Sequence, residues 1–389
     1  MNKDEFAARH LGPNAAAQRE MLATIGAASI EDLLHRVPAK ARLARPLAIG
    51  PAVAEMDLVR LMRGLAAKNA HADSHVCFLG AGAYDHYVPS PINHLISRGE
   101  FFTAYTPYQP EASQGTLRTI YEYQTMIAEL TGMDVANASI YDGASSLAEA
   151  ALMAHAVTGR DGIVISRGVN PLYRQVVASY AAGPRLRLKE VPLGDGATDL
   201  AQLKKAVSDK TAAVVLQYPN FFGFLEDVQA AAEIAHAAKA LCVVAVDPVS
   251  LGLLAPPGAL GADIVVGEGQ GIGVSLAYGG PYLGFFATKT DLIRRMPGRL
   301  VGVTVDRDGK RGFVLTLQTR EQHIRREKAT SNICTNVALC ALMTTIHLAL
   351  IGKQGLRKVG ELALAKAHYA AESLSKIPGV RLRFTAPFF

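Results

Sequence analysis

The spacing of hydrophobic and polar positions divides the chain into three parts. In residues 1–75 the apolar positions recur every three or four residues, and Ser29 and Asp32 form a capping box ahead of such a run. This pattern predicts a helical N-terminal segment over residues 1–75, which needs another surface to pack against.

From about residue 120, short apolar runs alternate with helical patterns. The runs predict strands at Ile163–Ser166, Leu186–Val191, Ala213–Tyr218, Leu241–Val246, Ile264–Val266 and Leu283–Ala287. Helices are expected at Tyr121–Leu130, Ser145–Val157 and Val228–Ala240. This alternation is typical of a doubly wound α/β fold with a mainly parallel sheet, which we assign to residues 76–320.

After residue 320 the pattern is helical again. Two helices are expected at Asn336–Ile351 and Leu356–Leu374, followed by one strand at Val380–Phe384. Because one strand cannot form a sheet, we expect residues 321–389 to be the incomplete start of a small α+β domain.

Composition excludes several classes of protein. Of the 389 residues, 50% are apolar and 19% are charged, which indicates a globular protein rather than a disordered or fibrous one. Polar residues interrupt the apolar run at 333–351, so it predicts a buried helix and no membrane span. The N-terminus lacks a signal-like apolar stretch, and a cytoplasmic chain is expected.

The formal charge of +6 does not by itself indicate nucleic acid. The basic residues are scattered and no aromatic-rich basic ribbon accompanies them, so an acidic protein partner explains the charge equally well. The sequence contains no P-loop, zincin or serine-hydrolase signature. His71, His75 and Cys77 lack a second ligand cluster, and no metal site is expected.

The most informative position is Asp247, at the end of the apolar run LCVVAV. In pyridoxal-phosphate (PLP) enzymes of the aspartate-aminotransferase class, a strand-end carboxylate pairs with the pyridine nitrogen, and a lysine later in the chain forms the Schiff base. Here the corresponding position falls at Gln270 or Gly271, and no lysine or arginine lies between Lys239 and Lys289. The slot for the lysine is empty.

The segment YDGASS gives a second indication that no cofactor binds. In this fold the PLP phosphate lies at a helix start, here Asp142 and Gly143. Asp142 would repel the phosphate by about 4 kcal/mol per pair of unit charges at ~4 Å and an effective dielectric of ~20. A plain N-cap is the preferred role for Asp142. We therefore interpret Asp142, Gly143 and Asp247 as vestigial cofactor positions.

Several long blocks carry a family resemblance: FLGAGAYDHYVP, YTPYQPEASQGTLR, GADIVVGEGQ and TREQHIRREKATSNICTN. They resemble the glycine decarboxylase family, the P-proteins of the glycine cleavage system, in the α subunit of its two-subunit form. The resemblance implies fold type I and an α2β2 assembly whose β subunit carries PLP and the lysine. It implies decarboxylation of glycine and transfer of the aminomethyl group to lipoylated H-protein. The family usually has histidine where this chain has Asn170, and its members continue beyond residue 389.

Two further segments hold candidate functional residues. In YTPYQPE, the side chains of Tyr105, Tyr108, Gln109 and Glu111 combine aromatic walls with hydrogen-bonding groups, and two prolines stiffen the loop. We consider them candidates for contacts with substrate or with a neighbouring subunit's site; a rigid interface loop without catalytic contact stays an open alternative.

A basic segment follows, with candidate carrier-docking residues Arg320, Arg325, Arg326 and Lys328. A solvated face is the alternative to docking of an acidic carrier, for which the resemblance suggests H-protein.

Two other functions remain open at this point. One is a self-sufficient PLP-dependent lyase or aminotransferase whose lysine lies elsewhere, and the other is a regulatory or scaffold protein. The leading interpretation is a non-catalytic α subunit that binds no cofactor itself.

Overall fold

The computed structural model describes residues 10, 12–43, 45, 47–71, 74–78, 80, 82–333 and 336–389. The chain divides into two units, residues 1–79 and 80–389. Each unit is described by itself.

The first unit is helical where it is described. It contains α2 (Ala15–Ile25), α3 (Ile30–Leu33) and α4 (Glu55–Ala66). The expected capping box at α3 is present: the Asp32 N–H donates to Ser29 Oγ at 3.2 Å, and the Ser29 N–H donates to the Asp32 carboxylate at 2.9 Å. No residue of these three helices is buried, so their apolar faces stay exposed within the unit.

Seven strands form one sheet within the described part of the second unit, in the order β1-β7-β6-β5-β4-β2-β3. Their bounds are β1 (Val135–Ala136), β2 (Gly162–Ser166), β3 (Arg187–Val191), β4 (Thr211–Tyr218), β5 (Leu241–Val246), β6 (Ile264–Glu268) and β7 (Gly284–Thr288). Strands β2 to β6 pair in parallel, while β7 runs antiparallel to β6 and β1 antiparallel to β7. The mainly parallel α/β sheet predicted from the sequence is confirmed.

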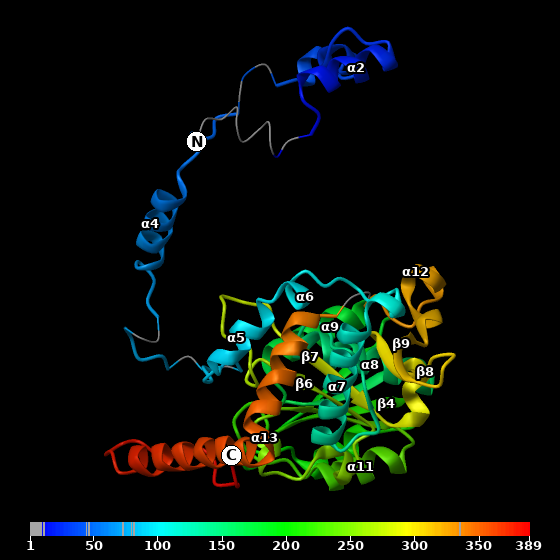
Figure 1. Ribbon diagram of the computed structural model, residues 1–389. Helices are drawn as coiled ribbons and strands as arrows, with labels where there is room; N and C mark the ends of the chain where they lie inside the picture. Colours follow the sequence, from blue (N-terminus) through cyan, green and yellow to red (C-terminus); the bar gives the residue numbers. More distant parts are fainter. Residues whose placement is uncertain are drawn as a thin grey trace. The chain divides into compact units, whose positions relative to one another are not determined.

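Helices cover both faces of this sheet (Figure 1). Residues of α8 (Gly143–Thr158) and α9 (Pro171–Ala182) pack on one face, and residues of α7 (Gln114–Thr131), α10 (Leu200–Ala206) and α11 (Val228–Ala237) on the other. Strand β5 shows why its sequence is continuously apolar: Val243 and Ala245 face α8, whereas Cys242 and Val244 face the opposite layer.

A hairpin that the sequence pattern did not predict follows the sheet. Strands β8 (Leu300–Val305) and β9 (Arg311–Thr316) pair antiparallel, and Gly309, with a φ of 78°, lies in the turn. The shorter helices of the unit are α5 (Ser90–Ile96), α6 (Gly99–Phe102) and α12 (Gln322–Arg325).

The C-terminal helix α13 (Ala338–Ser375) contains a break at Gly352, whose φ of 57° and ψ of −175° are not helical. It thus corresponds to the two helices expected from the sequence. By length and composition α13 could cross a membrane. Its first half is instead packed into the core, where the Thr344 hydroxyl donates to the Ile272 carbonyl at 2.9 Å, and its second half extends away from the sheet (Figure 1).

The expected strand at Val380–Phe384 is wrong. These residues have no ladder partner among the described strands, and a strand without a neighbour is not stable. Aromatic contacts hold the tail instead: Phe384 packs edge-on to Phe224 with centroids 5.5 Å apart, and Phe388 stacks on His368 at 4.1 Å.

Candidate functional site

A cavity of about 410 Å³ opens at the carboxyl ends of the parallel strands. Doubly wound sheets bind their ligands at this edge. Polar lining comes from the ends of β4, β5 and β6, from the start of α9 and from the loop before α5. These polar residues are His86, Asn170, Tyr173, Gln217, Asn220, Asp247, Glu268 and Gln270. Among the described lining residues there is no lysine or arginine.

Asp247 lies where the sequence predicted it, directly after β5, and lines the cavity. Its carboxylate accepts a hydrogen bond from the Val249 N–H at 3.0 Å. Desolvation raises the pKa of Asp247, and the Val249 N–H and the nearby His86 oppose that rise. A strand-end carboxylate is therefore retained without a cation from a lysine or arginine in the cavity.

The lysine slot is filled by other contacts. Gln270 is buried and donates from its side chain to the Val274 carbonyl at 2.8 Å. At Gly271, a Cβ would lie 3.0 Å from Cδ2 of His86. A side chain at position 271 requires the imidazole ring of His86 to shift by a few tenths of an ångström, so there is little space beside Gly271.

The start of α8 is occupied by the chain's own carboxylates. Asp142 is the N-cap, and its side chain accepts from the Ser145 N–H at 2.7 Å, as preferred from the sequence. The Gly143 N–H donates to Oε2 of Glu268 at 2.9 Å. A Cβ at Gly143 would lie 2.6 Å from the Tyr173 hydroxyl oxygen, so only glycine allows this close packing.

Sequence reasoning missed Glu268. Its second oxygen accepts from the Gln270 N–H at 3.0 Å and the Leu283 N–H at 2.8 Å. Burial raises the pKa of Glu268 to about 7, against the lowering effect of three backbone N–H donors. An acidic residue at the end of a buried strand, between two glycines, was the available signal; its partner at Gly143 lies 125 residues earlier.

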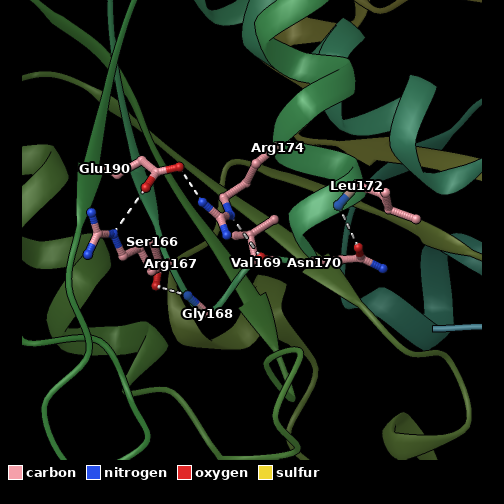
Figure 2. A network of polar contacts seen from close by, with 8 residues as sticks. All are labelled: Ser166, Arg167, Gly168, Val169, Asn170, Leu172, Arg174 and Glu190. Carbon is pink, nitrogen blue, oxygen red and sulfur yellow. Dashed lines mark hydrogen bonds and ion pairs between the residues drawn. The ribbon is translucent and has the colours of Figure 1, made fainter. Parts of the chain in front are cut away.

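Asn170 also lines the cavity, and Figure 2 shows its local network. Its side-chain oxygen accepts from the Leu172 N–H at 2.9 Å, which makes it the N-cap of α9, and its own N–H donates to Gln217 Oε1 at 2.8 Å. Beside it, Arg167 and Arg174 both contact Glu190. Asparagine is a good N-cap, so this position has a structural role here.

The four candidates in the YTPYQPE loop do not line this cavity. Tyr105 is 82% exposed and borders a separate, mainly apolar groove of about 250 Å³ with Phe101, Phe102 and Leu339. Gln109 and Glu111 are exposed too. Exposed side chains that do not line the chain's own cavity are available for contact with a neighbouring subunit.

Tyr108 differs from Tyr105 because Arg299 holds its hydroxyl group. The Arg299 guanidinium donates to Tyr108 Oη at 2.9 Å and lies 5.4 Å from the ring centroid. Arg299 is 3% exposed and pairs with the buried Glu321 at 3.5 Å. Sequence reasoning missed Arg299, which joins the YTPYQPE loop to the start of the basic segment.

The basic segment is smaller than expected, because Arg320 does not belong to its exposed face. The Arg320 guanidinium donates to the Met296 carbonyl and, at 2.9 Å, to the Gly298 carbonyl, and desolvation lowers its pKa. Arg325, Arg326 and Lys328 are exposed. Arg320 is half-buried and bonded to two backbone carbonyls, so the candidate docking patch consists of the three exposed cations. Of these, Arg325 also donates to the Thr319 carbonyl at 3.0 Å but stays exposed.

Comparison with known proteins identifies the family. The model of the "Glycine cleavage system P-protein" family matches residues 8–388. The chain belongs to the P-protein family. A probable glycine dehydrogenase (decarboxylating) subunit 1 from Carboxydothermus hydrogenoformans is 56% identical over 371 residues, covering 95% of this chain and 83% of the relative. The same subunit of Moorella thermoacetica is 56% identical over 380 residues, covering 98% and 85%.

Solved structures agree with this P-protein assignment. A crystal structure of glycine decarboxylase (P-protein) of the glycine cleavage system, in inhibitor-bound form, matches with a TM-score of 0.90 and 49% identity, over 98% of this chain and 85% of that chain. A sphingosine-1-phosphate lyase from Burkholderia pseudomallei matches with a TM-score of 0.63 at 14% identity, over 90% of this chain and 81% of that chain. The second likeness concerns the fold alone, which is that of PLP-dependent fold type I enzymes.

The residues of this P-protein chain do not fit PLP in its own cavity. No amine stands at Gln270 or Gly271. The backbone N–H of Gly143, at the helix start where a phosphate would lie, is already bonded to Glu268. No step of a PLP reaction is therefore assigned to this cavity.

Proposed function

We propose that the chain acts as subunit 1, the α subunit, of a two-subunit glycine decarboxylase. The observation that carries this proposal is the agreement over nearly the whole chain with relatives of that name and with a glycine decarboxylase structure. With its partner, the complex decarboxylates glycine and transfers the aminomethyl group to the lipoyl arm of H-protein.

In this proposal the partner β subunit holds PLP in an α2β2 assembly. PLP supplies the electron sink for loss of the glycine carboxylate. Two observations support its location in β: the α chain has no amine at Gln270 or Gly271, and the helix start at Gly143 is occupied by Glu268. Both defects lie in the α cavity, so the α chain contributes by other means.

The α chain contributes through the YTPYQPE loop, whose exposed side chains border the partner's site. Tyr105, Gln109 and Glu111 supply hydrogen-bonding groups and exclude water there, while Arg299 fixes the loop through Tyr108. Exposure of these groups in the isolated chain supports the proposal, because interface residues are exposed before assembly.

The carrier docks on the exposed cations Arg325, Arg326 and Lys328. Replacement of all three by glutamine should raise the apparent KM for H-protein and weaken its dependence on salt, since exposed charges act mainly on association. Arg307, Lys310 and Arg311, exposed on the β8–β9 turn and at the start of β9, form a control that removes the same number of charges. An equal effect of both sets would contradict a specific docking patch.

Co-expression with a candidate β subunit tests the proposal. Glycine–bicarbonate exchange with lipoylated H-protein should require both subunits, and only preparations that contain β should be yellow. Activity of the α chain alone would favour the self-sufficient PLP enzyme. An assembled α–β complex in which α does not increase the activity of β would favour the scaffold protein. The comparisons support neither alternative.

A further inference from the structure

The carboxylate of Glu268 occupies the positive end of α8, a helix of 16 residues. One oxygen accepts from the Gly143 N–H at 2.9 Å, and the other from the Gln270 and Leu283 N–H groups at 3.0 and 2.8 Å. The first N–H groups of a helix lack partners within the helix, and the helix dipole favours an anion beside them. Burial raises the pKa of Glu268 to about 7, so above this pH its carboxylate supplies that anion from within the chain.

Close packing at Gly143 limits the space for a second anion on that side of the carboxylate. A Cβ at Gly143 would meet the Tyr173 hydroxyl oxygen at 2.6 Å and the Glu268 nitrogen at 3.1 Å. The neighbouring Asp142 carboxylate is committed to the Ser145 N–H. An external phosphate would have to displace Glu268 and then lie beside the charge of Asp142, which repels it.

We propose that Glu268 determines what the cavity of this chain binds: its carboxylate takes the anion position at the start of α8 and thereby excludes phosphorylated ligands. The cavity of about 410 Å³ beside it remains open to small molecules without phosphate. This inference concerns binding to the α chain alone, so it stands or falls independently of the proposed function.

Removal of the carboxylate should convert the helix start into a phosphate site. In Glu268→Ala the three backbone N–H donors lose their acceptor, and an added anion restores it. The probes are inorganic phosphate and pyridoxine 5′-phosphate, which has no aldehyde and forms no imine with surface lysines. At constant ionic strength, calorimetry should show at least roughly tenfold tighter binding than to the wild-type chain, a factor that corresponds to about 1.4 kcal/mol.

Asp142→Asn is the matched control. It removes one negative charge from the same helix start, keeps a good N-cap and leaves Glu268 in place, so it should bind phosphate as weakly as the wild type. Pyridoxine without phosphate should not distinguish the variants. The inference is overturned if Asp142→Asn gains as much affinity as Glu268→Ala, since net charge would then be the cause. It is also overturned if the wild-type chain binds pyridoxine 5′-phosphate as tightly as Glu268→Ala.

A folding assay covers the case in which Glu268→Ala does not fold in ordinary buffer. Its refolding yield is then compared in phosphate and in chloride of equal ionic strength, with Asp142→Asn as the reference for general effects of phosphate on stability. A phosphate-dependent gain larger than that of Asp142→Asn supports the inference. Equal yields in both salts, including none in either, would overturn it.

Discussion

Removal of the Tyr108 hydroxyl group tests whether Arg299 anchors the YTPYQPE loop. In Tyr108→Phe the guanidinium loses an acceptor at 2.9 Å, and Arg299 is only 3% exposed. A hydrogen bond to a charged group contributes about 1.5 to 3 kcal/mol. Because Tyr108 is itself 47% exposed, water partly replaces the lost oxygen, and we expect a loss of about 1 to 2 kcal/mol in unfolding free energy.

Urea denaturation followed by far-ultraviolet circular dichroism measures this change, since the chain has no tryptophan. Tyr105→Phe is the matched control. The Tyr105 side chain is 82% exposed, so the unfolding free energy of this variant should change by less than about 0.5 kcal/mol. In the assembled complex, loss of a hydroxyl group that bonds to the transition state should cost about 1 to 3 kcal/mol, roughly a fivefold to 150-fold loss of exchange rate. Equal stability of Tyr108→Phe and wild type would refute the role of Arg299 as an anchor of the loop. An unchanged exchange rate in both variants, with intact assembly, would show that the loop contributes only packing.

Three further predictions follow from the cavity. Borohydride reduction of the isolated chain with PLP should label surface lysines diffusely; trapping at one stoichiometric buried lysine would contradict the empty slot. Gly271→Lys should show no decarboxylase activity without β, because the histidine ring packed on Gly271 and the occupied helix start both remain. The pKa of Glu268 is about 7 in the folded state against 4.5 in the unfolded state, so between these pH values the folded state binds one more proton. The unfolding free energy should therefore fall by about 3 kcal/mol as pH rises from 4.5 through 7. A Glu268→Gln chain whose unfolding free energy keeps the same dependence on pH would disprove this.

The central sheet could be predicted from the sequence because its inner strands are buried on both faces. Strand β5 therefore reads as an unbroken apolar run, and β4 is apolar from Ala212 to Leu216. The β8–β9 hairpin escaped prediction because β8 does not alternate between buried and exposed positions: its first two residues are buried, and Val303 and Val305 are 48% and 65% exposed. The opposite error arose at Val380–Phe384, where residues of high strand propensity have no sheet edge to join.

Positions that directly follow a predicted strand could also be located in the sequence. Asp247 and the absence of a lysine at Gln270 or Gly271 were found in this way. Roles that depend on tertiary contacts could not. Arginine is usually found at the surface, yet the Arg320 guanidinium donates to carbonyl groups 22 and 24 residues earlier. Likewise, nothing in the segment GEGQG indicates that its carboxylate reaches Gly143, because only the folded sheet brings the end of β6 to the start of α8.

Two features of this chain both disfavour a bound PLP: the absence of a lysine and the occupied start of α8. Without a lysine at Gln270 or Gly271 no covalent link retains a cofactor, and without a free helix start no phosphate retains it either. The backbone donor of Gly143 at the start of α8 needs an acceptor, and Glu268 supplies one that is covalently part of the chain. The contact that satisfies the Gly143 N–H therefore also blocks a phosphate group at this position. Repair of the lysine alone leaves this second barrier intact, so cofactor binding should return only when the lysine slot and the helix start are changed together.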